Sequence, residues 1–178
     1  MDEYPTMGTE IKITTAPYEF KGFMGMRNFT IETADGKMVA WANSSWTHLA
    51  ISTGIPARLT PADTDNYVLS EKMKMDYAPR KIKLPDGMIL QESFVVQKHH
   101  LDTNHHVNNC QYVCMAEDFL PEDFKVYQMR AEYKMQAKLG DTICPKTKAE
   151  NGKVVVSLDD ENEKPYAILE FAEKQENL

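Results

Sequence analysis

Segments rich in β-branched and aromatic residues alternate with short polar turns along most of the chain, and this alternation constrains the fold most. Near the N-terminus such segments cover residues 11–20, 23–33 and 38–51. Lys21-Gly22 and residues 34–37 (Ala-Asp-Gly-Lys) separate them as turns. Because connections this short join neighbouring antiparallel strands, the pattern predicts an antiparallel meander.

The second half of the chain predicts a strand, one helix and another meander. Residues 92–101 favour a strand, and residues 107–120 favour a helix that stops before Pro121. Further strands are expected around residues 128–134, 141–150, 153–158 and 165–172, joined by tight turns such as Asn151-Gly152. One helix among antiparallel strands indicates an α+β fold.

The two halves look like unequal copies of one unit. Residues 7–11 (Met-Gly-Thr-Glu-Ile) match residues 139–143 (Leu-Gly-Asp-Thr-Ile), and each stretch opens a meander. Proline-rich residues 55–91 are predicted to be a linker. We therefore expect a partial first unit over 1–54, without its opening strand and helix, and a complete second unit over 92–178. The uncovered sheet of the first unit predicts a partner chain, an altered packing or a truncated gene product, and we expect a homo-oligomer.

Composition excludes several classes of protein. A net charge of −7 over 178 residues argues against nucleic acid as a partner, because phosphate backbones demand a basic surface. The longest apolar runs are far shorter than a membrane span, and residues 1–20 lack the pattern of a signal peptide. The three cysteines have no metal-knuckle spacing and suit reduced thiols. We expect a cytoplasmic protein without a membrane span.

Residues 101–109 carry the densest set of hydrogen-bonding side chains, and they lie where the predicted helix begins. A helix N-terminus has unpaired N–H groups and partial positive charge, which stabilise an oxyanion. Asp102, Asn104 and His106 are suited to hold and activate a water beside a carbonyl carbon, as hydrolysis of an acyl group requires. In a simpler interpretation, Asp102 or Asn104 only caps the helix.

A metal site is a second simpler interpretation of the same segment. Histidines 99, 100, 105 and 106 together with Asp102 offer the imidazole and carboxylate ligands that suit zinc. Adjacent pairs of histidines rarely supply two ligands to one ion. We therefore expect no metal, and no cofactor is expected either.

The pattern Asp102-x-Asn104-x-His106-Val107-Asn108-Asn109, followed by Tyr112 and a helix, resembles the active-site motif of acyl-acyl carrier protein (acyl-ACP) thioesterases. Members of that family are tandem hot-dog units, in which an antiparallel sheet wraps around a central helix. The resemblance therefore implies an α+β hot-dog fold whose first unit is incomplete. It also covers residues 4–8, 27–29, 53–58 and 132–141, and so spans nearly the whole chain.

The resemblance implies an enzyme of fatty acid biosynthesis, a thiolester hydrolase that releases free fatty acid from acyl carrier protein. Asp102, Asn104 and His106 are then catalytic, and Asn108 and Tyr112 are substrate-binding residues.

One position departs from the family pattern. The family's further catalytic carboxylate aligns with Gln136, which is unable to act as a general base but can orient water. Glu132, four residues earlier, is an alternative base, and the sequence does not choose between them. Ala137 stands where a cysteine nucleophile aligns, which favours direct attack by water.

Basic residues gather in the predicted linker of an otherwise acidic chain. Since carrier proteins are acidic, we hypothesise a docking patch there, made of Lys72, Lys74, Arg80, Lys81 and Lys83. An ordinary solvated linker is the alternative.

Three other functions stay open at this point. Hydrolysis of acyl-coenzyme A is the enzymatic alternative, because related single hot-dog thioesterases also have an aspartate before a helix. Gln136 and the incomplete first unit motivate a non-catalytic acyl-binding protein. A dehydratase on the same fold has only Glu117 as a helix carboxylate to support it.

Overall fold

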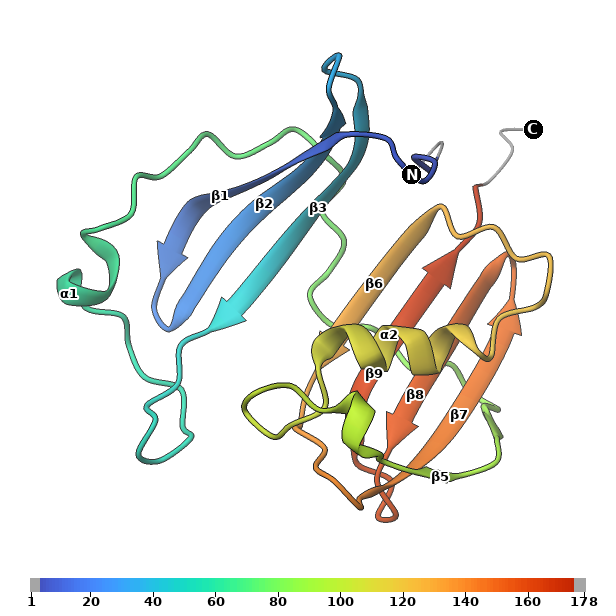
Figure 1. The fold of residues 1–178 in the computed structure, drawn as a ribbon. Coiled ribbons are helices and arrows are strands. Elements are labelled where there is room, and N and C mark those ends of the chain that lie inside the picture. The colour runs from blue at the N-terminus through green and yellow to red at the C-terminus, as the bar shows by residue number, and fades with distance from the viewer. Residues whose placement is uncertain (1–3, 175–178) are drawn as a thin grey trace. The chain divides into compact units, whose positions relative to one another are not determined.

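The computed structural model describes residues 4–174, and the chain divides into two compact units, 1–78 and 79–178 (Figure 1). The boundary falls inside the segment 55–91 that the sequence predicted to be a linker. Residues 55–78 belong to the first unit, and residues 79–91 belong to the second.

The first unit contains a three-stranded antiparallel sheet in the order β1-β2-β3. Its strands β1 (Ile11–Lys21), β2 (Met24–Thr33) and β3 (Met38–Thr47) confirm the predicted meander, although β3 ends four residues early. Gly22 and Gly36, in the turns between them, have φ of 63° and 84°, a conformation that favours glycine. The short helix α1 (Pro61–Thr64) follows.

Residues 73–77 pack against one face of this sheet, and the other face is more exposed. On one face Asn28 is buried, because its side-chain amide donates to the Tyr77 hydroxyl (3.1 Å) and its carbonyl accepts from the Met73 N–H (3.1 Å). On the other face Ile11, Ile13 and Trp46 are 40, 66 and 56% exposed. Within residues 4–78 this second face therefore has the exposed apolar surface that the sequence predicted.

The second unit is a larger antiparallel sheet in the order β4-β7-β8-β9-β6, with β5 also paired to β7. The strands predicted after the helix are confirmed. The elements are β4 (Ile89–Leu90), β5 (Phe94–Val95), β6 (Gln128–Tyr133), β7 (Thr142–Glu150), β8 (Lys153–Asp159) and β9 (Pro165–Ala172).

The prediction of a strand over residues 92–101 was largely wrong. Within that range only β5 forms a strand, and the 3₁₀ helix η1 (Lys98–His100) follows it. Local hydrogen bonds explain the difference: the Gln97 N–H donates to Nδ1 of His100 (3.0 Å), and the Leu101 N–H donates to the Lys98 carbonyl (3.2 Å). These bonds compete with pairing in the sheet.

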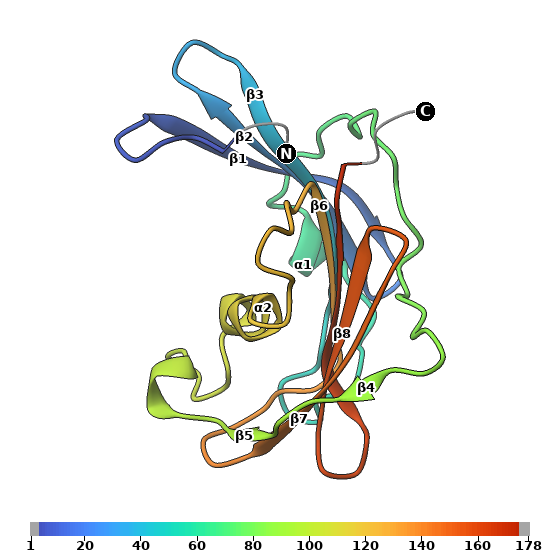
Figure 2. The ribbon, with the colours of Figure 1, turned by 90° about the vertical axis from the view of Figure 1, so that its right-hand side faces the viewer.

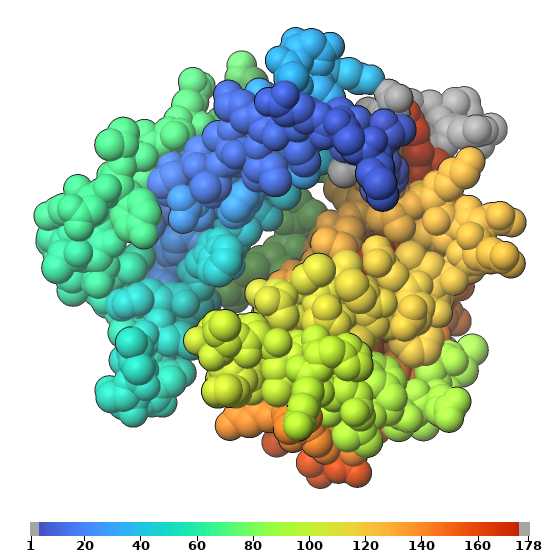
Figure 3. Space-filling view, viewed as in Figure 1, coloured from blue at the N-terminus to red at the C-terminus, as the bar shows by residue number. Residues whose placement is uncertain are grey.

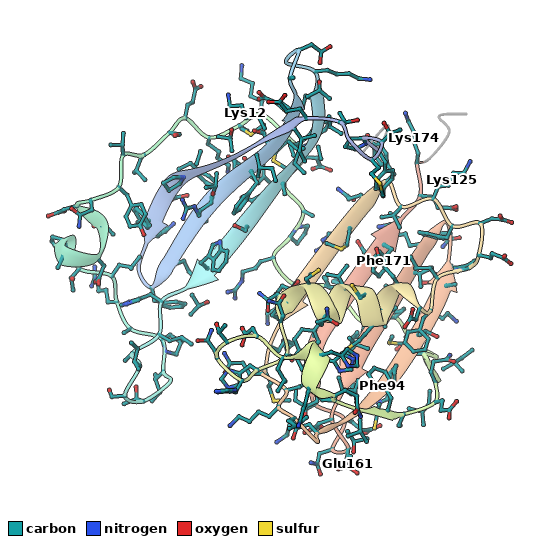
Figure 4. The ribbon with its side chains drawn as sticks, in the orientation of Figure 1. Lys12, Phe94, Lys125, Glu161, Phe171 and Lys174 are labelled. Carbon is teal, nitrogen blue, oxygen red and sulfur yellow. The ribbon has the colours of Figure 1, made fainter. Side chains whose placement is uncertain are left out.

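Helix α2 (Asn109–Glu117) lies across one face of the second sheet (Figures 1 and 2). It is shorter than predicted, because Asn108 caps its start and Pro121 follows its end. Its buried side chains, Tyr112, Met115 and Ala116, share one helical face. They pack on a core of β8 and β9 that includes Val156, Leu169 and Phe171, the last labelled in Figure 4.

The opposite face of the same sheet is covered by residues 79–88, which Figure 2 shows on the far side of the strands from α2. Ile82 packs there with Val155 and Ile168. The Arg130 guanidinium secures this segment, because it donates to the Pro79 carbonyl (2.6 Å) and to Glu170 (2.9 Å). Burial of both faces accounts for the almost continuous apolar run of β8.

Candidate active site

The loop between η1 and α2 is closed by its own hydrogen bonds, and we call residues 101–108 the aspartate loop. Leu101 and Val107 form an antiparallel bridge at its base. Oδ1 of Asp102 accepts from the N–H of Asn104 (2.8 Å) and from the N–H of His106 (3.3 Å). The Asp102 N–H donates to the His106 carbonyl (2.9 Å). One carboxylate oxygen thus sets the path of the loop.

Neighbouring backbone anchors the aspartate loop on two sides. The Asn108 N–H donates to the His100 carbonyl in η1 (2.9 Å), and the Val107 N–H donates to the Ala137 carbonyl (2.9 Å). The Ala137 N–H in turn donates to the hydroxyl of Tyr112 on α2 (2.9 Å). The loop, η1, residues 136–138 and α2 therefore form one hydrogen-bonded assembly.

The N-terminus of α2 presents a donor that sequence reasoning missed. Oδ1 of Asn108 accepts from the Cys110 N–H (2.9 Å), so the Asn108 side chain serves as the helix cap. Within residues 4–174 the Asn109 N–H has no hydrogen-bond acceptor. Donors in the first helical turn point out along the axis, where partial positive charge favours a developing oxyanion. The signal that could have identified this donor from the sequence is Asn108 itself, a residue type favoured as a helix cap.

Electrostatics keep Asp102 ionised. Desolvation raises the pKa of its carboxyl, but the N–H groups of Asn104 and His106, the Asn104 side chain and the nearby His106 together lower the pKa below its ordinary value. The carboxylate is consequently negative at neutral pH. Only its Oδ1 accepts the two backbone bonds, so Oδ2 takes part in neither.

The other predicted catalytic residues differ in their exposure and in the elements that carry them. Asn104 is exposed at the tip of the aspartate loop, and His106 is partly buried. Gln136 is exposed three residues beyond the end of β6, next to Ala137, whose backbone bonds to Val107. In the space-filling view, the aspartate loop and α2 lie on the visible face of the second unit (Figure 3).

Glu132 lies on the opposite face of the sheet from α2. It pairs in register with Ile168, and its Oε2 accepts from the Ile82 N–H (3.2 Å), while Oε1 contacts Nζ of Lys134 (3.2 Å). Because β6 ends at Tyr133, the two-residue alternation of a strand does not extend to Gln136. Glu132 and Gln136 therefore occupy different environments, and Gln136 is the one beside the aspartate loop.

The predicted substrate-binding residues belong to both units of the chain. Tyr112 is buried, with 2% exposure, and its hydroxyl is bonded to Ala137. Lys72 and Lys74 belong to the first unit, where Nζ of Lys72 lies 4.0 Å from the centre of the Tyr77 ring. Arg80, Lys81 and Lys83 lie in the segment that covers the far face of the second sheet. Within the second unit, Arg80, Lys81 and Lys83 therefore lie on the opposite side of the sheet from α2, the helix that follows the aspartate loop.

Two absences hold within the described residues. No three or more histidine, cysteine, aspartate or glutamate side chains are grouped closely enough there to hold a metal ion. Each helix between residues 4 and 174 is too short or too polar to cross a membrane.

Comparisons with known proteins agree with this geometry. A family model described as the acyl-ACP thioesterase C-terminal domain matches residues 85–173, half of the 178-residue chain. The match contains the aspartate loop, α2 and the strands β6 to β9. No curated protein matches the sequence.

Solved structures share the fold at low sequence identity. The 12:0-ACP thioesterase from Umbellularia californica aligns with a TM-score of 0.83 at 16% identity, over 96% of this chain and 70% of its own. An acyl-ACP thioesterase from Bacteroides thetaiotaomicron aligns with a TM-score of 0.79 at 17% identity, over 91% of this chain and 68% of its own. A putative oleoyl thioesterase from Lactobacillus plantarum aligns with a TM-score of 0.78 at 20% identity, over 94% of this chain and 68% of its own.

At these identities the solved structures show the fold, and it is the α+β hot-dog fold that the sequence predicted. The family model matches the half of the chain that contains the aspartate loop, and it identifies the family. The chain therefore belongs to the acyl-ACP thioesterase family.

Proposed function

We propose that the chain hydrolyses fatty acyl thioesters of acyl carrier protein, and that the aspartate loop is the catalytic site. One observation carries this proposal: an ionised carboxylate, Asp102, is fixed in the loop that leads into the N-terminus of α2. A negative group that holds water and a backbone donor that stabilises an oxyanion are the two requirements of acyl transfer to water.

In the proposed mechanism the thioester carbonyl oxygen accepts from the Asn109 N–H, which polarises the carbonyl carbon. Water attacks that carbon and forms a tetrahedral oxyanion. The C–S bond then breaks, the oxyanion returns to a carboxyl group, and the thiolate takes up a proton as carrier protein leaves. Tyr112 is proposed to be a positioning residue, because its hydroxyl holds Ala137, and the Ala137 carbonyl holds Val107 of the loop.

Proton removal from the water is assigned to His106. A carboxyl group with a lowered pKa is a weak base, so Asp102 suits holding and orienting the water better than deprotonating it. Histidine is the side chain that most often serves as a general base in enzymes. Asn104, within the loop, and Gln136, next to the Ala137 that bonds to the loop, are exposed amides and are proposed to orient the water or the substrate.

A non-catalytic acyl-binding protein is the second candidate, and Gln136 is the observation that favours it. The family carboxylate is replaced there by an amide, and Glu132, the nearest alternative, faces away from α2. Such a protein binds acyl thioesters without turnover.

Carrier protein is proposed to dock beside the aspartate loop. Lys98, in η1, and Lys138, next to Ala137, flank the loop on its two anchored sides, and both are exposed. Their positive charge suits an acidic carrier. Arg80 and Lys81 lie across the sheet from the loop, so we propose Lys98 and Lys138 in their place.

The catalytic role is tested by Asp102→Asn. Asparagine keeps an oxygen that accepts from the two loop N–H groups, so the loop stays folded while its negative charge is lost. We expect kcat/KM for dodecanoyl-ACP to fall by about 100-fold or more. Asp118→Asn, at the exposed C-terminus of α2, is the matched control and is expected to leave the rate unchanged.

Two results contradict the assignment of Asp102. If Asp102→Asn and wild type hydrolyse dodecanoyl-ACP at equal rates, Asp102 has no role in the mechanism. A folded wild-type chain that binds dodecanoyl-ACP without releasing dodecanoate supports the acyl-binding candidate instead.

The role of His106 as the base is tested by substitution at a pH where Asp102 stays ionised. Because the pKa of Asp102 is lowered on folding, the stabilising contribution of its carboxylate is complete above its ordinary pKa and is lost only as pH falls through the lower folded value. At pH 7, His106→Asn should lower kcat/KM for dodecanoyl-ACP by about 100-fold or more, because the proposed base is lost. His99→Asn is the matched control and should leave the rate unchanged. A wild-type rate in His106→Asn contradicts the proposed base.

Docking is tested by charge reversal of Lys98 and Lys138. The double variant Lys98→Glu, Lys138→Glu should raise KM for dodecanoyl-ACP by about tenfold, because exposed charges act on encounter with an acidic partner. The KM for the small substrate dodecanoyl-pantetheine should not change. Arg80→Glu, Lys81→Glu is the matched control. Equal effects on both substrates, or a larger effect of the control, would rule out this docking surface.

A further inference from the structure

Cys110 and Cys114 lie about one turn apart on the exposed face of α2, the helix drawn across the second sheet in Figure 1. Residues four apart in a helix are neighbours on its surface. The buried side chains of this helix, Tyr112, Met115 and Ala116, lie on the opposite face. Both thiol groups are therefore accessible, and neither belongs to the core that holds α2 on the sheet.

The side chains of Cys110 and Cys114 converge. Desolvation, the charge of Cys110 and a hydrogen bond between the two thiol groups raise the pKa of Cys114 above its ordinary value. A hydrogen bond between thiols requires the two sulfur atoms to be close together. The third cysteine of the chain, Cys144, is half-buried on β7 and belongs to a different element. Cys110 and Cys114 thus form a dithiol pair on one helix.

The spacing of this pair suits a bridging ion better than a disulfide. Cβ atoms four residues apart in a helix are separated by about 5–6 Å. A disulfide requires about 3.5–4.5 Å between its two Cβ atoms, so its formation would distort the helix. An ion bonded to both sulfur atoms spans the longer separation and leaves the helix regular.

The number and kind of ligands select a soft ion. Thiolates bind soft metals such as univalent copper, and they also bind zinc. Zinc requires three or four protein ligands. Glu117 shares the helical face of the pair, but residues 4–174 contain no group of three or more histidine, cysteine, aspartate or glutamate side chains that could hold a metal ion. Univalent copper is satisfied by two thiolates.

We propose that Cys110 and Cys114 bind one univalent copper ion between their sulfur atoms. Each thiol loses its proton, two Cu–S bonds form, and the copper remains univalent. The site uses no side chain that is assigned to thioester hydrolysis, so it does not depend on the proposed function. It also differs from the zinc site of histidines and Asp102 that the sequence offered as an alternative.

Anaerobic titration of the full chain with univalent copper, in competition with the chelator bicinchoninate, tests this site. We expect the wild-type chain to bind one equivalent of copper. Cys110→Ser and Cys114→Ser should each weaken this binding by about 100-fold or more, because the second thiolate otherwise forms its bond within the same molecule. Titration with divalent zinc should give binding at least about tenfold weaker than that of copper, since further ligands are missing.

Two control variants locate the copper on α2. Cys144→Ser is the matched control and should bind copper as the wild-type chain does, because its thiol lies on β7. Asp102→Asn should also bind as wild type, which separates this site from the proposed catalytic loop. Circular dichroism verifies that each variant is folded, and Cys114→Ala provides a second variant of the pair if Cys110→Ser or Cys114→Ser does not fold.

Four outcomes overturn the proposal: no saturable copper binding by the folded wild-type chain, wild-type affinity in a folded variant of Cys110 or Cys114, weakened binding in Cys144→Ser, or binding of zinc as tight as that of copper.

Discussion

The packing of α2 against β8 and β9 is the interaction on which the rest of the second unit depends. Tyr112, Met115 and Ala116 bury one helical face on the sheet, and this burial fixes where the helix begins. Tyr112 also carries a hydroxyl that bonds to Ala137. A single buried side chain thus contributes to the core and determines the position of the loop that precedes the helix. The chemistry proposed for the loop depends on that position, because the backbone donor at Asn109 is fixed by the helix.

The same carboxylate that organises the aspartate loop is the one assigned to hold water. Oδ1 of Asp102 is used by the backbone, and this use lowers the pKa of the group. Oδ2 takes no part in those two bonds. Folding of the loop therefore produces an ionised carboxylate in a fixed orientation, at the cost of making it a poor base. The separation between holding water and removing its proton explains why a second group, His106, enters the proposed mechanism.

The meanders were predictable because their strands are rich in β-branched and aromatic residues and their turns contain glycine, as at Gly22 and Gly36. The Asp102 motif and the helix that follows it were also evident. Elements that depend on local side-chain bonds were not: η1 forms through His100 and Gln97, which no periodicity reveals. The basic residues of the predicted linker were grouped by their closeness in sequence, whereas the structure divides them between two units.

Hydrogen–deuterium exchange of the full chain with a non-hydrolysable thioether analogue of dodecanoyl-ACP tests the central claim most directly, because it locates the bound thioester group without requiring turnover. The account predicts slower exchange of the amides in residues 101–112, with Asn109 among the most protected, and loss of this protection when unacylated carrier protein is used. Binding of the analogue with unchanged exchange across residues 101–112 would contradict the assignment of the aspartate loop as the catalytic site.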